Sequence, residues 1–165
     1  MNNEITIDGV VYVRKDKCSC PIVKNKDNDK KYGFTGETTV YNGHTLHRII
    51  ALKDFDEIEK GDIGGWIEDE KNLSHKGECW VSDNAYIYDN ACVCGNARVY
   101  DDALVCDNAC IRDNARVYDD ACVRDNACVC GNARVCDFAR VFGKTRVRGK
   151  SCICGCEKIY EGVID

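Results

Sequence analysis

Histidine, the side chain most often used as a general base near neutral pH, occurs only three times among the 165 residues. His44 and His47 lie in the segment TTVYNGHTLHRIIAL, and His75 lies in NLSHKG. A general base needs a substrate pocket beside it, and no Ser-His-Asp set, phosphate-binding glycine loop or metal-spaced histidine cluster accompanies these residues. We therefore expect no catalytic residue. His75 is the weak alternative, and a capping or corner role is the favoured interpretation for it.

Fourteen cysteines could supply disulfides or metal-binding thiolates. Most of them occupy the variable positions of a repeat described below. The candidate metal-binding group is Cys92, Cys94, Cys128 and Cys130. Residues i and i+2 of a flat strand lie about 6.5–7 Å apart, which is too wide for a compact tetrahedral site. We predict mainly free thiols, also in the loop pair Cys18 and Cys20, with no metal and no cofactor.

The elements that would position these groups follow from a six-residue repeat. Alanine, then an aliphatic residue, then Asp or Gly alternate with variable residues, and the unit reads A-x-[VI]-x-[DG]-[ND]. This alternation is strand periodicity, and the final pair predicts a corner because Asp, Asn and Gly tolerate left-handed backbone. The aliphatic positions are Val81, Ile87, Val93, Val99, Val105, Ile111, Val117, Val123, Val129, Val135, Val141, Val147, Ile153 and Ile159.

Short strands and corners at a fixed period predict a solenoid. Three units per coil would make a triangular prism with Val and Ile inside. The unit resembles the hexapeptide-repeat family, which implies an all-β fold, a single-stranded left-handed parallel β-helix. The left hand is taken from the resemblance, because it departs from the usual crossover rule. Residues 79–165 would form about five coils, a rod about 25 Å long at a strand spacing of ~4.8 Å.

The N-terminal part shows no repeat. We expect a small β-hairpin-rich region over residues 1–62. The segment EITIDGVVYVRK predicts two short strands around Asp8-Gly9, and Asn42-Gly43 predicts the turn of a second hairpin.

A capping segment is expected over residues 63–78, between this region and the repeat. A solenoid must cover the open end of its apolar core. We expect Trp66 and Trp80 to do so.

The block FTGETTVYNGHTLHRIIALKDFDEIEKGDIGGWIEDEKNLSHKG resembles a leader seen on hexapeptide-repeat proteins of bacteria and their phages, which are often labelled acyltransferases. Such a label rests on the fold, and a fold does not determine a function. The resemblance implies that an acyltransferase would use a histidine base beside a loop protruding from the helix. From Cys79 to Ile159 the period never slips, so no protruding loop is expected.

An 18-residue coil stacks residues i and i+18, so the outer surface can be read in columns. One wall carries arginines beside tyrosines, and aspartates mark the corners. The candidate binding residues are Arg98, Arg116, Arg134, Tyr100 and Tyr118 on that wall, Asp83, Asp101, Asp119 and Asp137 at one corner, and Asp89, Asp107 and Asp125 at another. The alternatives are an Arg–Asp lattice that solubilises the wall, and aspartate as simply a good corner residue.

A second wall, which begins with Tyr86 and Leu104, mixes apolar and polar residues and could hold a second copy of the chain. The net charge of −5 argues against direct binding to nucleic acid. No apolar run reaches membrane-spanning length, and MNNEITIDG is not a signal peptide. We therefore expect a cytoplasmic protein.

The leading interpretation is a non-enzymatic binding protein, phage or prophage encoded and acting in the host cytoplasm. Its acidic corners and rigid faces would engage a host protein. The sharpest version is inhibition of a nucleic-acid-handling or defence enzyme, such as a CRISPR nuclease, by a regular acidic rod that mimics DNA. The alternatives are a hexapeptide-type acyltransferase and a structural or assembly module.

Overall fold

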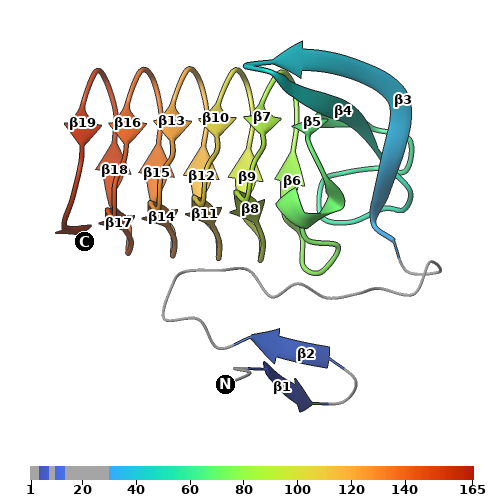
Figure 1. The fold of residues 1–165 in the computed structure, drawn as a ribbon, viewed down its shortest axis with the longest axis horizontal. Helices are drawn as coiled ribbons and strands as arrows, with labels where there is room; N and C mark the ends of the chain where they lie inside the picture. The colour runs from blue at the N-terminus through green and yellow to red at the C-terminus, as the bar shows by residue number, and fades with distance from the viewer. Residues whose placement is uncertain (1–3, 8–9, 14–29) are drawn as a thin grey trace.

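The computed structural model describes residues 4–7, 10–13 and 30–165. Figure 1 shows a rod of stacked coils with a long curved hairpin at its N-terminal end. Every regular element of the described residues is a strand, apart from the single 3-10 turn η2 (Glu70–Asn72). The predicted fold class, an all-β parallel β-helix preceded by a hairpin-rich region, is confirmed.

The first two strands are β1 (Glu4–Ile7) and β2 (Val10–Val13), which pair antiparallel as predicted. The expected turn at Asp8-Gly9 and the cysteine pair Cys18 and Cys20 lie outside the described residues.

The second hairpin joins β3 (Tyr32–Tyr41) to β4 (His44–Ala51). Its two turn residues both have positive φ, 49° at Asn42 and 85° at Gly43. A two-residue turn with φ > 0 at both positions matches the twist of antiparallel strands. The Asn-Gly prediction is confirmed.

The coils form three parallel walls, which we name A, B and C. Wall A continues into the hairpin, in the order β19-β16-β13-β10-β7-β5-β4-β3. Its coil strands are β5 (Ile63–Ile67), β7 (Tyr86–Ile87), β10 (Leu104–Val105), β13 (Cys122–Val123), β16 (Arg140–Val141) and β19 (Lys158–Ile159). Wall B holds β8 (Cys92–Val93), β11 (Cys110–Ile111), β14 (Cys128–Val129), β17 (Arg146–Val147) and β20 (Val163–Ile164). Wall C holds β6 (Trp80–Val81), β9 (Arg98–Val99), β12 (Arg116–Val117), β15 (Arg134–Val135) and β18 (Cys152–Ile153).

The apolar core is the stack of aliphatic and alanine columns inside the walls. The alanine and valine of one unit, such as Ala115 and Val117, are both completely buried. Val117 pairs with Val99 on one side and Val135 on the other, which is the 18-residue step expected from the sequence. The regular step holds through every coil pair from β6 to β19.

Each corner places one residue in the left-handed region of backbone space. Asp or Gly holds this position, with φ from 55° to 63° at the eight corner aspartates. The aspartates add a contact that glycine cannot make. In seven cases the Oδ2 atom accepts a hydrogen bond from the backbone N–H of the corner residue one coil further on, at 2.8 to 3.4 Å. We call these contacts corner rungs. They connect Asp83, Asp101, Asp107, Asp113, Asp119, Asp125 and Asp137 to the next coil.

The rod has about six coils rather than the five expected. Ile67 and Leu73 are buried inside an additional first coil, in register with Ile87 and Val93. Leu73 and Val81 are eight residues apart, so the six-residue spacing does not identify this coil.

Two glycines make room for the first coil. A Cβ atom at Gly64 would lie 2.5 Å from a side-chain carbon of Ile49 and 2.7 Å from the Trp80 ring. At Gly65 it would lie 2.8 Å from Val81 and 2.9 Å from a backbone oxygen. Any side chain at either position would therefore push the first coil apart.

The two tryptophans have different roles. Trp80 is buried against Tyr32 and Phe55 at the N-terminal end of the core, as expected. Trp66 is not part of this cover, because it lies in the outward column of wall A, beside Tyr86. Its ring packs there under the Arg48 guanidinium, 5.0 Å from the ring centroid. No helix long and apolar enough to cross a membrane occurs in the described part of the chain.

The contribution of the corner rungs to stability can be tested at Asp119. Its carboxylate accepts the hydrogen bond of one rung, and its backbone N–H donates the hydrogen bond of another. Asp119→Ala removes the carboxylate acceptor. It also leaves an alanine at φ 56°, a left-handed conformation that its Cβ atom disfavours and that no side-chain hydrogen bond then offsets. We expect a loss of about 2 kcal/mol in the free energy of unfolding, from a lost hydrogen bond and left-handed strain. Asp119→Gly should lose only about half as much. Urea denaturation measures both.

The matched control is Asp102→Ala, which changes the exposed aspartate that follows the corner residue Asp101 and has ordinary φ. Its carboxylate accepts an exposed hydrogen bond from Asn84 at 3.2 Å, and the variant should stay within about 0.5 kcal/mol of wild type. Equal stabilities of the Asp119→Ala and Asp102→Ala proteins would contradict a structural role for the rungs.

Candidate functional site

The predicted arginine and tyrosine columns lie on wall C. Arg116 pairs in register with Arg98 on one side and Arg134 on the other. Tyr100 and Tyr118 follow β9 and β12 directly, two residues after Arg98 and Arg116 and therefore on the same outer face. We call these five residues the Arg–Tyr strip.

The two tyrosine rings of the strip are stacked. Their centroids lie 5.0 Å apart and their planes differ by 1°. Burial raises the pKa of Tyr100 above its ordinary value, so the phenol stays neutral at physiological pH. The rings therefore form a flat aromatic surface along the rod.

The arginines of the strip differ in their ion pairing. Arg98 pairs with Asp56, which lies in the loop after β4. Arg116 and Arg134 are exposed, and within the described residues their guanidinium groups form no hydrogen bond or ion pair. The Arg–Asp lattice considered from the sequence is therefore absent at these two positions. The neighbouring aspartates direct Oδ2 to backbone N–H groups of the next coil.

The corner aspartates repeat at a regular spacing, but one oxygen of most of their carboxylates is bonded to the backbone of the next coil. Asp101, Asp119 and Asp137 form one column in which each Oδ2 is occupied by a corner rung. One oxygen of each carboxylate remains for solvent or a partner. Asp102 and Asp120 stand outside the rung system and are exposed.

His75 lies in the cover at the N-terminal end of the rod. Its ring stacks on Tyr32, with centroids 4.2 Å apart, and its Nδ1 accepts a hydrogen bond from the Lys31 backbone N–H at 3.2 Å. The side chain is only 8% exposed, and its burial lowers the His75 pKa. A neutral, enclosed imidazole fits the predicted capping role.

Lys31 is also part of this cover, and no pattern in the sequence predicts that its side chain is buried. Its ammonium group is buried and donates to the carbonyl oxygens of Gly77, at 3.2 Å, and Cys79, at 2.7 Å. Burial lowers the Lys31 pKa. A buried ammonium is stable only where hydrogen-bond acceptors replace water. Through these two bonds Lys31 fixes the backbone of Gly77 and Cys79, which leads into wall C.

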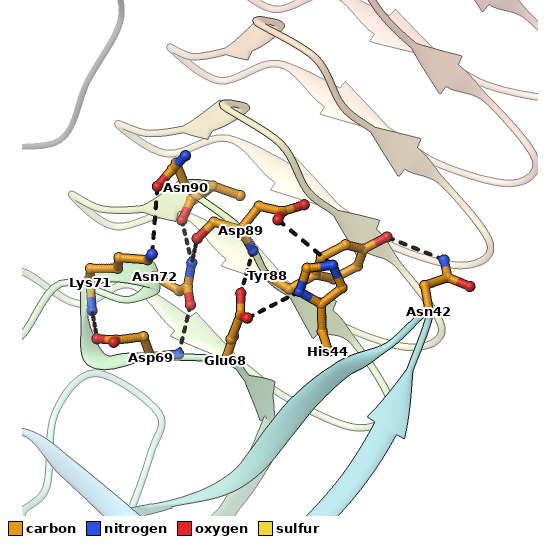
Figure 2. Close-up of polar contacts among 10 residues, drawn as sticks. Asn42, His44, Glu68, Asp69, Lys71, Asn72, Tyr88, Asp89 and Asn90 are labelled. Atoms are coloured by element: carbon orange, nitrogen blue, oxygen red, sulfur yellow. Dashed lines mark hydrogen bonds and ion pairs between the residues drawn. The ribbon is translucent and has the colours of Figure 1, made fainter.

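His44, Glu68 and Asp89 form a second polar cluster, at the junction of hairpin and rod. Figure 2 shows their side chains pointing toward one another from three elements. His44 Nδ1 lies 3.0 Å from Glu68 Oε1, and His44 Nε2 lies 3.7 Å from Asp89 Oδ1. Glu68 Oε2 also accepts the Asp89 backbone N–H at 2.7 Å. We call this group the junction cluster.

Contacts within the junction cluster shift the pKa values of His44 and Glu68. The hydrogen bond to Glu68 and the charge of Asp89 raise the His44 pKa, and the hydrogen bond from His44 lowers the Glu68 pKa. Both shifts favour charged forms. The His44 ring also packs on Tyr88, with centroids 4.7 Å apart, which limits its rotation.

Most of the described cysteines have free thiols, as predicted. Cys128 is the exception, since it is disulfide-bonded. Several thiols that the repeat places on outer positions are nevertheless buried, including Cys106 and Cys110. Within the described residues, the cysteines that form no disulfide are Cys79, Cys92, Cys94, Cys106, Cys110, Cys122, Cys130, Cys136, Cys152, Cys154 and Cys156.

Comparison with known proteins gives one relevant similarity. Over 55 residues the chain is 42% identical to a protein of Escherichia coli (strain K12) named as the uncharacterized acetyltransferase YdcK. The match spans 33% of this chain and 17% of that protein's length. No protein-family model matches the sequence. The similarity and the β-solenoid together fit a hexapeptide-repeat β-helix.

The capping assignment of His75 can be tested by His75→Ala. The substitution leaves the Lys31 backbone N–H without its acceptor and removes the stacked partner of Tyr32. We expect a loss of about 2 kcal/mol in unfolding free energy. Lys76→Ala, at the exposed neighbouring position, should change it by less than about 0.5 kcal/mol. Calorimetric or urea unfolding distinguishes them, and unchanged stability of His75→Ala would refute the capping role.

Proposed function

We propose that this protein is a binding module that holds a short anionic segment of a partner protein on the Arg–Tyr strip. The observation that carries the proposal is the exposure of Arg116 and Arg134 without an ion-pair partner among the described residues. A guanidinium group presents several N–H donors in a planar fork that matches carboxylate or phosphate oxygens. Two such groups in register supply repeated anion-binding positions.

The stacked Tyr100 and Tyr118 rings support the same proposal. They lie on the face that carries the arginines, and their planes are parallel. Aromatic rings add contact area with little loss of side-chain entropy, because few torsions must be fixed. The strip stands on paired backbone, so binding requires little reorganisation of the rod.

The charge of the surroundings favours a short partner segment over a long polyanion. The chain has a net charge of −5, and aspartates occupy the corners beside the strip. A nucleic acid lying across these corners would meet like charge. A short segment with a few carboxylates or phosphates can contact the arginines and avoid the corners.

Arg116→Glu with Arg134→Glu tests this function. With a glutamate-rich peptide as probe, we expect the double substitution to weaken binding at least about tenfold, equivalent to ~1.4 kcal/mol. The control is Arg140→Glu with Arg146→Glu, which makes the same charge change on exposed arginines of walls A and B. Fluorescence anisotropy at two salt concentrations measures the affinities. Equal weakening by both double variants would contradict a site on wall C.

The acidic corners remain the basis of a narrower proposal, that a phage-encoded protein of this kind inhibits a nucleic-acid-handling or defence enzyme of its host. The exposed Asp102 and Asp120 are the appropriate positions for testing it, because charge reversal there leaves the corner rungs intact. In a pull-down of a DNA- or RNA-binding partner, Asp102→Lys with Asp120→Lys should abolish capture. Capture that persists would contradict inhibition through the acidic corners. It would not affect the separate proposal that the Arg–Tyr strip binds an anionic segment.

A hexapeptide-type acyltransferase is the second candidate, favoured by the similarity to a protein named as an acetyltransferase. The described histidines support it less well. His75 is enclosed by the cover, and both ring nitrogens of His44 face carboxylates. Isothermal titration with acetyl-CoA should therefore give no saturable heat. Binding that is lost in a folded His75→Ala protein would establish this candidate in place of the first.

A further inference from the structure

The junction cluster is brought together by strand order. Within wall A, β4, β5 and β7 are consecutive neighbours, with β4 antiparallel to β5 and β5 parallel to β7. The start of β4 therefore lies at the same edge as the ends of β5 and β7. His44 begins β4, Glu68 follows β5 directly, and Asp89 stands at the corner after β7. This edge is visible in Figure 1, where the hairpin meets the first coils.

Asp89 is the one corner aspartate whose side chain does not form a corner rung among the described residues. In its own column, Asp107 accepts the N–H of Asp125, and Asp125 accepts that of Gly143. The Asp89 carboxylate instead turns toward His44. The chain thus gives up a repeated structural hydrogen bond to bring a second carboxylate to the imidazole.

The corner rung that would accept the Asp89 backbone N–H is also replaced, by a hydrogen bond to Glu68. Asp69 would be its acceptor by register, but this side chain caps η2 by accepting the Lys71 N–H at 3.1 Å. Glu68 Oε2 takes over and accepts the Asp89 N–H. This bond holds the Glu68 carboxylate so that its other oxygen faces His44.

The cluster offers more acceptors than a neutral imidazole can satisfy. Neutral imidazole carries one N–H, yet each ring nitrogen of His44 faces a carboxylate oxygen. One ligand atom from each residue can be chosen so that all three lie within 4.8 Å of one another. A proton or a cation can fill this gap: an imidazolium would donate to both carboxylates, and a divalent cation would neutralise the charge of −2 that the cluster carries with a neutral imidazole.

We propose that His44, Glu68 and Asp89 bind a divalent transition-metal cation of the Zn²⁺ class. An imidazole with two carboxylates suits such a cation better than Mg²⁺ or Ca²⁺, which prefer oxygen ligands alone. Zinc bonds to nitrogen and oxygen are about 2.0–2.2 Å long, which places tetrahedral ligand atoms about 3.4 Å apart, so ligand atoms within 4.8 Å of one another need to approach by only about 1.4 Å at most. The three side chains are 30%, 29% and 32% exposed, which leaves room for water at the remaining coordination positions.

A bound cation would tie the hairpin to the rod. His44 comes from the hairpin, whereas Asp89 belongs to the second coil. A cation that binds the folded arrangement and not the unfolded chain stabilises it by mass action. The site would thus supply a metal-dependent link between the two parts.

The test is an imidazole-selective NMR titration of the full chain with ZnCl₂. Free thiols elsewhere also take up zinc, so total binding is not diagnostic. The three histidines give three separate signals, and we expect Zn²⁺ to shift those of His44 and leave those of His47 in place. His44 signals that do not move at saturating zinc would overturn the proposal without any substitution.

Asp89→Asn provides the second arm, with Asp107→Asn as its matched control one coil further along the same corner column. Asp89→Asn should weaken the Zn²⁺ response of His44 at least about tenfold, the loss that even an outer-shell change produces. Asp107→Asn should leave that response unchanged. Equal responses in the two variants would show that Asp89 is not a ligand and would contradict the proposed site.

Discussion

Every sixth residue of the rod must adopt a left-handed backbone conformation, and the rest of the structure depends on how the chain meets this requirement. Glycine would meet it without strain, but glycine carries no side chain. Aspartate tolerates the conformation and uses its carboxylate to accept a backbone N–H from the next coil. The same residue therefore turns the chain and connects adjacent coils. The result is a rod whose period of 18 residues holds without a protruding loop from β6 to β19.

This use of the corners determines the chemistry of the surface. A carboxylate oxygen that accepts a backbone N–H is less available to a neighbouring guanidinium, and Arg116 and Arg134 are left exposed beside the stacked tyrosines. One oxygen of each such carboxylate is thus committed to the rod and not open to a partner. At Asp89, where the rung is absent, the carboxylate joins His44 and Glu68 instead. Both candidate sites are consequences of where the corner carboxylates are directed.

The repeated part of the fold could be predicted from the sequence, because each feature there depends on neighbours a fixed number of residues away. Val117 is buried and stacked on Val99 and Val135 for reasons visible in the pattern. The junction could not be predicted in this way. His44 and Glu68 are 24 residues apart, and they meet because β4 adds to the edge of β5. The Asn-Gly turn does locate His44 at a strand start, but pairing it with Glu68 requires the strand order. Trp66 and Lys31 are similar cases, since spacing indicates neither the outward position of one nor the burial of the other.

The central claim is that corner aspartates are bonded within the rod and that Arg116 and Arg134 of wall C, which have no ion-pair partner among the described residues, form the proposed binding surface. The most direct measurement is NMR chemical-shift mapping of the full chain with a glutamate-rich peptide, followed at the arginine side-chain and tyrosine ring signals. The account predicts that Arg116, Arg134, Tyr100 and Tyr118 shift together and saturably, while Arg140 and Arg146 do not. Shifts confined to residues outside wall C, or no saturable shift at the strip, would contradict it.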